Sequence, residues 1–175
     1  MKTFSIFAAC IMMAATLLFS SPVRAQTTAV HALHFDLGVD AGYPTGNLTI
    51  SSKFVLGGTA RLAYGITNDF AVTFTSGADH FFSKINPATG HVFDSFGTIP
   101  IKAGGKYFFI PHIYVGVEGG IALEEVDSGH GNTKTLISSS LGWANKEWDV
   151  GIRYDNFSGQ SDPYGFVALR VAYGF

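Results

Sequence analysis

Charged side chains of both signs alternate with apolar ones along much of this 175-residue chain. In residues 148–155, Trp, Val, Ile and Tyr occupy one parity, while Asp149, Arg153 and Asp155 lie on the other. Carboxylates and cations that share one face can form ion pairs, line an ion path, or serve as acids and bases. The full set is Asp36, Asp40, Asp79, Glu118, Glu124, Asp149 and Asp155, with Arg61, Lys102, Lys106, Arg153 and Arg170.

Other reactive residue types are scattered. The histidines are His31, His34, His80, His91, His112 and His130, and no two of them have the spacing of a specific metal site. Cys10 is the only cysteine and lies in an apolar N-terminal run, so the rest of the chain has no thiol for a disulfide, a metal site or a nucleophile. The glycine pairs lie within predicted strands and form no phosphate loop. We therefore predict no catalytic residue, no metal and no cofactor.

The N-terminus resembles a secretory signal peptide. A short basic start, Met1-Lys2-Thr3, precedes an apolar run over residues 4–19, and Val23-Arg24-Ala25 matches a small-residue cleavage site. The alternative is a membrane anchor, but the run is shorter than the roughly 20 residues that a spanning helix needs. We predict a cleavable signal over residues 1–25 and one domain over residues 26–175.

The composition of the predicted mature chain excludes several classes of function. Removing Lys2 and Arg24 from the 11 basic residues leaves 9 against 13 acidic ones, a net charge of −4. This balance disfavours nucleic acid as a partner. No later apolar run reaches 18 residues, so helical membrane spans are not expected.

Apolar and polar residues alternate with a period of two in eight segments, which predicts eight strands. The segments are residues 30–40, 53–66, 70–82, 96–108, 113–124, 134–144, 148–155 and 164–175. Long polar loops over 42–52, 83–95, 125–133 and 156–163 alternate with short turns over 67–69, 109–112 and 145–147. A bulge or irregularity is expected at Pro100, because proline cannot donate to a strand ladder.

No helix or second sheet is available to cover the apolar face of these strands, and lipid is the simplest cover. We therefore predict an all-β fold, an eight-stranded antiparallel up-and-down transmembrane β-barrel. An aromatic girdle is expected at the short-turn end: Tyr64, Phe70, Tyr107, Phe108, Phe109, Trp143, Trp148, Tyr173 and Phe175. The candidates for the outer girdle are Tyr43, Phe54, Phe81, Phe82, Phe93, Phe96 and Tyr164.

Eight strands enclose a space that side chains can fill, and isolated charges there would be costly. We expect an interior plugged by ion pairs among Asp36, Arg61, Lys102, Lys106, Glu118, Asp149, Arg153 and Arg170. An ion path along the same residues is the alternative.

Four segments resemble the small eight-stranded outer-membrane barrels of the OmpA/OmpX type, in particular the porin-like "outer membrane protein beta-barrel domain" of Bacteroidetes type. They are residues 99–108, 114–120 and 151–154 and the ending 169–175. The resemblance implies a Gram-negative outer-membrane protein, exported through the secretion translocon and periplasmic chaperones. It also implies insertion by the barrel-assembly machinery, which reads a C-terminal aromatic signal, here Tyr173 and Phe175. It implies no agreed substrate.

Lipid A deacylases share this architecture and place a His-x-Ser pair near the outer rim. This chain has Asn156-Phe157-Ser158 in the corresponding region, and asparagine cannot act as the general base. His130 lies in another predicted outer loop, but nothing in the spacing brings it to Ser158. We therefore predict a protein that is not an enzyme.

We expect a monomer in outer-membrane lipid with a structural or surface-binding role through its extracellular loops. The alternatives are a narrow porin-like channel, a lipid A-modifying acyl hydrolase and, outside the membrane, a soluble β-barrel with an internal ligand.

Overall fold

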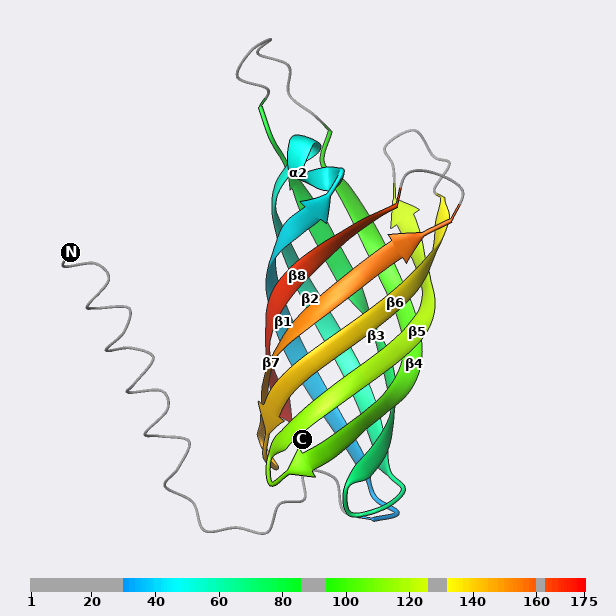
Figure 1. The fold of residues 1–175 in the computed structure, drawn as a ribbon, viewed down its shortest axis with the longest axis vertical. Coiled ribbons are helices and arrows are strands. Elements are labelled where there is room, and N and C mark those ends of the chain that lie inside the picture. The colour runs from blue at the N-terminus through cyan, green and yellow to red at the C-terminus, as the bar shows by residue number, and fades with distance from the viewer. Residues whose placement is uncertain (1–29, 86–93, 126–131, 160–162) are drawn as a thin grey trace, which may run out of the picture.

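The chain forms a closed barrel of eight antiparallel strands in sequence order, in a computed structural model that describes residues 30–85, 94–125, 132–159 and 163–175. The strands are β1 (Leu33–Gly46), β2 (Ser52–Gly65), β3 (Phe70–Ser83), β4 (Phe96–Ile110), β5 (Ile113–Glu125), β6 (Thr133–Ala144), β7 (Trp148–Ser158) and β8 (Tyr164–Gly174). Each strand pairs with its sequence neighbours, and β8 closes the barrel against β1 (Figure 1). The predicted fold class is confirmed.

Side-chain burial alternates along every strand, as the period of two predicts. In β8, Val167, Leu169 and Val171 lie outward and are 39–52% exposed, while Ala168 and Arg170 lie inward and are buried. The same parity holds around the barrel, so its outer wall is apolar and its interior largely polar. No helix in the described part of the chain is long and apolar enough to cross a membrane.

The interior leaves little room near the middle of β4 and β5. A Cβ added at Gly104 would lie 2.0 Å from the carbonyl oxygen of Val117, and one added at Gly120 would lie 2.0 Å from that of Ile101. Any larger residue at these positions would force the neighbouring strands apart, so glycine there permits the close approach of backbones.

The two ends of the barrel differ. The short connections after β2, β4 and β6 lie at the same end as the start of β1 and the end of β8 (Figure 1). The ends of β3, β5 and β7, from which the longer connections start, lie at the opposite end together with the short helix α2 (Leu48–Ser51). We call the latter the outer end, because outer-membrane barrels carry their longer loops outside the cell.

Several strands extend further toward the outer end than the sequence predicted. β1 continues to Gly46 and β7 to Ser158, so parts of the predicted loops 42–52 and 156–163 are strand. The cause is pairing: Pro44 lies opposite Phe166, and Ser158 lies opposite Thr135. Polar and turn-forming residues are tolerated in these strands because a partner strand is available.

Pro100 interrupts the ladder without shifting its register. Pairing of β3 with β4 ends at Ser76–Ile101 and resumes at Asp79–Thr98 in the same register. The expected irregularity is therefore a local gap, and no bulge forms there. The register shifts of β4 occur instead near its end, between Phe108 and Ile110 in the pairing with β5.

The aromatic residues at the short-turn end mostly face outward, as expected of a girdle. Phe108 is the exception, since it is buried inside against Tyr114. The prediction was wrong for part of the outer end: Tyr43, Phe54 and Phe82 face outward, whereas Phe81 and Tyr164 are buried in the interior and Phe96 packs against them. Phe93 lies outside the described residues.

Candidate functional site

The most distinctive chemistry of the described chain lies inside the barrel, where charged side chains from seven strands meet. Five cations and six carboxylates form one connected set of ion pairs, which we call the ionic network. Its members are Asp36, Asp40, Arg61, Asp79, Lys102, Lys106, Glu118, Asp149, Arg153, Asp155 and Arg170, all of them buried. Their strands fold so that every second residue points inward, which brings these charges together.

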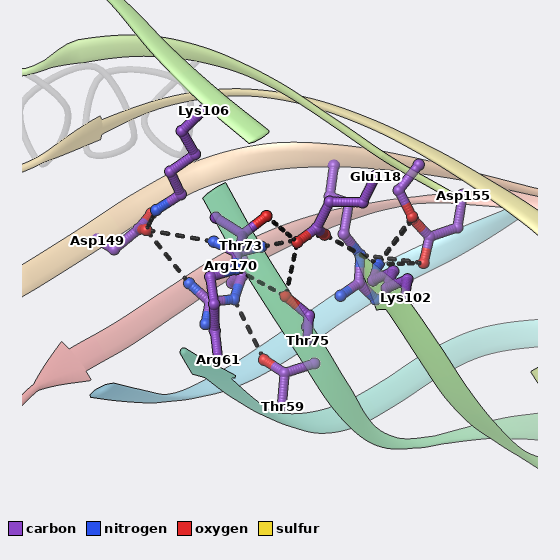
Figure 2. Close-up of polar contacts among 12 residues, drawn as sticks. Thr59, Arg61, Thr73, Thr75, Lys102, Lys106, Glu118, Asp149, Asp155 and Arg170 are labelled. Carbon is purple, nitrogen blue, oxygen red and sulfur yellow. Dashed lines mark hydrogen bonds and ion pairs between the residues drawn. The ribbon is translucent and has the colours of Figure 1, made fainter. Parts of the chain in front are cut away.

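Asp149 is the most highly connected carboxylate of the ionic network (Figure 2). Lys106 donates to it, and Arg61 and Arg170 lie 3.4 Å and 3.5 Å from its Oδ2. The Tyr114 hydroxyl donates to Oδ1 over 2.7 Å. One carboxylate on β7 thereby holds cations from β2, β4 and β8, which ties opposite walls of the barrel together.

Glu118 is the second centre, and hydroxyl groups complete its coordination. Thr73 and Thr75 donate to its Oε1 over 2.8 Å and 2.7 Å, and Arg61 and Lys102 lie 3.5 Å and 3.7 Å from its Oε2. The Thr75 hydroxyl also accepts a hydrogen bond from Nε of Arg61 over 2.9 Å. Both oxygens of this buried carboxylate are therefore engaged, which a buried charge requires.

Arg170 connects the closing seam of the barrel to the same network. It donates to Asp36 across the β1–β8 pair and, through Nε, to the Thr59 hydroxyl over 3.2 Å. Figure 2 shows this arginine beside Arg61, with both guanidinium groups pointing toward Asp149.

Nearer the outer end, Arg153 is shared among three carboxylates. It lies 3.4 Å from Asp40, 3.5 Å from Asp79 and 3.2 Å from Asp155. Lys102 donates to the Ser138 hydroxyl over 2.7 Å and lies 3.3 Å from Asp155. Acids outnumber cations in this part of the network.

On the outer-end side of the ionic network lies a layer of aromatic rings, which we call the aromatic layer. It consists of Phe81, Phe96, Phe157, Tyr164 and Phe166, with Val55 and Leu136 beside them. Phe81 stacks on Phe96 with ring centroids 4.5 Å apart and meets Phe166 edge-on at 5.6 Å. Phe157 stacks on Tyr164 at 4.7 Å. On β3 and β7 a ring follows a charge directly on the inner face: Phe81 lies two residues outward of Asp79, and Phe157 two residues outward of Asp155.

Polar groups lie beyond the aromatic layer, toward the outer end. The Tyr164 hydroxyl donates to Glu124, and Nζ of Lys134 donates to the Gly159 carbonyl over 3.2 Å. The same ammonium group lies 5.5 Å from the Tyr164 ring centroid. The described interior side chains therefore lie in three levels, from charges through rings to polar groups near the outer end.

All eight interior charges named from the sequence lie in the ionic network, and Asp40, Asp79 and Asp155 belong to it as well. Sequence reasoning missed Tyr114, the threonines around Glu118 and the aromatic layer. Their positions on the strands indicated that they face inward, because Phe81 lies two residues from Asp79 and Tyr114 lies four residues from Glu118, on the same strand face in each case. The preference of aromatic residues for lipid interfaces obscured it.

The two residues named as an assembly signal lie on the outer face at the short-turn end. Tyr173 is 41% and Phe175 72% exposed. The Phe175 N–H donates to the carbonyl of Phe35 over 2.8 Å, and its ring lies 5.2 Å from that of Tyr173. The predicted signal peptide, residues 1–25, lies outside the described residues.

The residues considered for catalysis form no defined site. Ser158 ends β7 and pairs with Thr135 on β6, so it is part of the wall and not of a loop. His130, the histidine considered for its activation, lies outside the described residues. Within the described ranges, no group of three or more His, Cys, Asp or Glu side chains is placed to hold a metal ion.

Comparison with solved structures identifies the architecture. The attachment invasion locus protein Ail of Yersinia pestis, in a phospholipid nanodisc, superimposes with a TM-score of 0.56 and 12% identity over 80% of this chain and 99% of its own. Neisserial surface protein A matches with a TM-score of 0.50 and 14% identity over 82% and 97%. OprG of Pseudomonas aeruginosa matches with a TM-score of 0.50 and 7% identity over 86% and 99%. No family model and no curated protein sequence matches the chain.

The chain is thus a small eight-stranded barrel of the outer-membrane type. Its apolar outer wall is the surface that such barrels present to membrane lipid. The single closed sheet pairs every strand within one chain, as in a monomeric barrel.

Proposed function

We propose that the protein is a closed outer-membrane barrel with a structural or surface-binding role, and that its outer connections meet the partner. The two layers of buried side chains inside the barrel support this proposal. The ionic network crosses the barrel from wall to wall, and the aromatic layer covers it with side chains such as Phe81 and Phe166 that have no solvent exposure. A hydrated ion would have to displace both.

Conductance in planar bilayers tests the closed lumen against the narrow channel. The protein refolded in detergent is added to the bilayer, and its heat-modifiable migration on a gel verifies that it is folded. We expect no conductance steps. Regular steps from the folded protein would contradict the proposal and favour the porin-like alternative.

The outer connections restrict the chemistry of a surface partner. Residues 47–51, 84–95, 126–132 and 159–163 contain Lys84 as their single lysine or arginine, against Asp94, Asp127 and Asp162. This weak acidity does not favour a polyanion. Retention of the folded protein on immobilised heparin at physiological salt would contradict this part of the proposal.

Export and assembly are expected to follow the route of other outer-membrane barrels. Residues 1–25 would direct secretion, periplasmic chaperones would hold the chain, and the barrel-assembly machinery would recognise Tyr173 and Phe175. Deletion of Phe175 should lower the amount of folded protein in the outer membrane, whereas Phe35→Ala, which removes a neighbouring ring, should not. Equal levels of the deletion variant and the parent chain would argue against the assembly signal. We also propose that the chain belongs to the porin-like barrel family of Bacteroidetes type that its sequence resembles.

No enzymatic activity is expected. Asn156 stands where a lipid A deacylase would place its histidine, and asparagine cannot accept the serine proton. Lipid A profiles of cells with the parent chain, with Ser158→Ala and without the protein should be identical. A change that depends on Ser158 would overturn this expectation.

A further inference from the structure

The apolar band on the outer wall of the barrel is not equally tall all the way round. From the short-turn end to the last apolar outward residue, it covers residues 54–64 on β2 and 113–123 on β5. On the three neighbouring strands β6, β7 and β8 it covers only residues 137–143, 148–154 and 167–173 (Figure 1). A strand rises about 3.3 Å per residue and tilts by about 40°, so each residue adds roughly 2.5 Å of height. The band is therefore about 25 Å tall on β2 and β5 and about 15 Å tall on β6 to β8.

The aromatic layer shows that this difference concerns one level of the wall. Val55 on β2 and Phe157 on β7 both belong to that layer. The outward residue next to each of them, on the short-turn side, is Leu56 on β2 and Asn156 on β7. At the same level the wall is thus apolar on β2 and polar on β7.

Four uncharged residues on β6 and β7, which we call the polar sector, replace apolar ones at this level. They are Thr133, Thr135, Asn156 and Ser158, and Thr135 lies directly opposite Ser158. Their side chains are short, so they cannot extend a polar end out of hydrocarbon as lysine and arginine do. Hydroxyl and amide groups that face acyl chains without partners are costly. The polar sector therefore fits lipid headgroups and water, at a level where β2 meets acyl chains.

We propose that the outer leaflet is thinner beside β6, β7 and β8 than beside β2, so that its headgroups contact the polar sector. A bilayer that meets a short apolar stretch thins locally to match it. A tilt of the whole barrel would instead shift both edges of the apolar band together. The inner edge is marked by exposed aromatic rings on both sides, Tyr64 on β2 and Trp148 on β7, and only the outer edge differs. The partner of the polar sector is thus the headgroup layer of the outer leaflet.

Nitroxide spin labels measure the difference in depth directly. Cys10 is the only cysteine, so Cys10→Ser gives a background in which a single new cysteine can be labelled. Asn156→Cys and Leu56→Cys are labelled in the full protein, refolded into dioleoylphosphatidylcholine vesicles, and collision rates with oxygen and with a water-soluble nickel complex give the depth of each label. Leu56 lies two residues inside the outer edge of its apolar span and Asn156 two residues beyond that of its own. The label at Asn156 should therefore lie about 10 Å closer to the aqueous phase, and equal depths would overturn the proposal.

A second pair of labels separates local thinning from a tilt of the barrel. Leu62→Cys on β2 and Val150→Cys on β7 are matched in level, because each lies seven residues from its member of the aromatic layer toward the short-turn end. Under the proposal these two labels lie at equal depth. A difference as large as that between Asn156 and Leu56, and in the same direction, would indicate a tilted barrel and overturn the proposal.

An apolar substitution in the polar sector should reduce the mismatch. The double variant Thr135→Leu/Asn156→Leu lengthens the apolar band on β6 and β7. Its unfolding in urea is compared between dioleoyl and thinner dimyristoleoyl phosphatidylcholine vesicles, and the advantage of the thinner bilayer should be smaller than for the parent protein. Ser76→Leu is the matched control, because it makes the same kind of change on the outward face of β3 and should leave that advantage unchanged. A double variant that keeps the full dependence on bilayer thickness would contradict the proposal.

Discussion

The two halves of the barrel interior carry side chains of opposite character. Toward the short-turn end, Asp149 and Glu118 hold cations and hydroxyl groups from several strands in a hydrogen-bonded network. Toward the outer end, Phe81 and its neighbours form a buried cluster of rings that need no hydrogen-bond partner. A charge network specifies which residues face one another, because a buried charge that loses its partner strongly destabilises the fold. A ring cluster excludes water and tolerates small shifts of its members.

Asp149→Ala is expected to cause the largest loss and tests the charged half. It would leave Lys106, Arg61 and Arg170 without their shared carboxylate, and breaking a buried ion pair typically costs about 3–5 kcal/mol. Urea unfolding in lipid vesicles, followed by tryptophan fluorescence, measures the change in the free energy of unfolding. Asp149→Asn, which keeps shape and hydrogen-bonding capacity, is the control and should lose less. A loss below about 1 kcal/mol for Asp149→Ala would show that the network is dispensable for stability.

Phe81→Ala tests the aromatic half and should cost about 3 kcal/mol, because truncating a buried phenylalanine leaves a cavity. The same unfolding measurement applies. Phe81→Leu, which refills most of the volume, should recover the greater part of that loss. The difference between the halves would disappear if Phe81→Leu were as damaging as Phe81→Ala, since the ring would then have a specific role comparable to that of a charge.

A pair of threonine variants separates the engaged part of the polar interior from the unengaged part. Thr75→Val removes a hydroxyl that joins Arg61 to Glu118 and should cost about 2 kcal/mol, as for hydrogen bonds to charged groups. Thr98→Val removes a hydroxyl that makes no hydrogen bond to the protein. The free energy of unfolding lost in Thr98→Val should be several times smaller. Equal losses for the two variants would mean that the hydrogen bonds of the Thr75 hydroxyl add nothing to stability.

Pro100→Ala, at the boundary between the two halves, should have the smallest effect. The substitution supplies an N–H where the β3–β4 pairing is interrupted, but the register is already continuous on both sides of the gap. The change in the free energy of unfolding is expected to stay within about 1 kcal/mol. Hydrogen exchange at Gly77 and Ala78 would show whether the ladder closes. A larger destabilisation would mean that the gap itself supports the interior packing.

Much of the fold could be predicted from the sequence because the inside and outside of a barrel wall differ in chemistry at every second residue. Parity alone placed Arg61 and Asp149 inside and Leu169 outside. Strand ends were less predictable, because Pro44 and Ser158 are strand residues only by virtue of their partners. The aromatic layer was missed because a phenylalanine suits both lipid and core, and only its parity relative to a charge distinguishes the two. The pairing within the network depends on three-dimensional register, which no single segment encodes.

The β1–β8 seam has a consequence for the time course of folding. Its ion pair joins Asp36 to Arg170 across 134 positions of sequence. Until β8 arrives, the free edge of β1 exposes a full row of unpaired amides and carbonyls, and such edges are templates for aggregation. Contacts of this range are also slow to form, because a long loop must close first. The chain must therefore be protected from its own first strand until its last strand is in place.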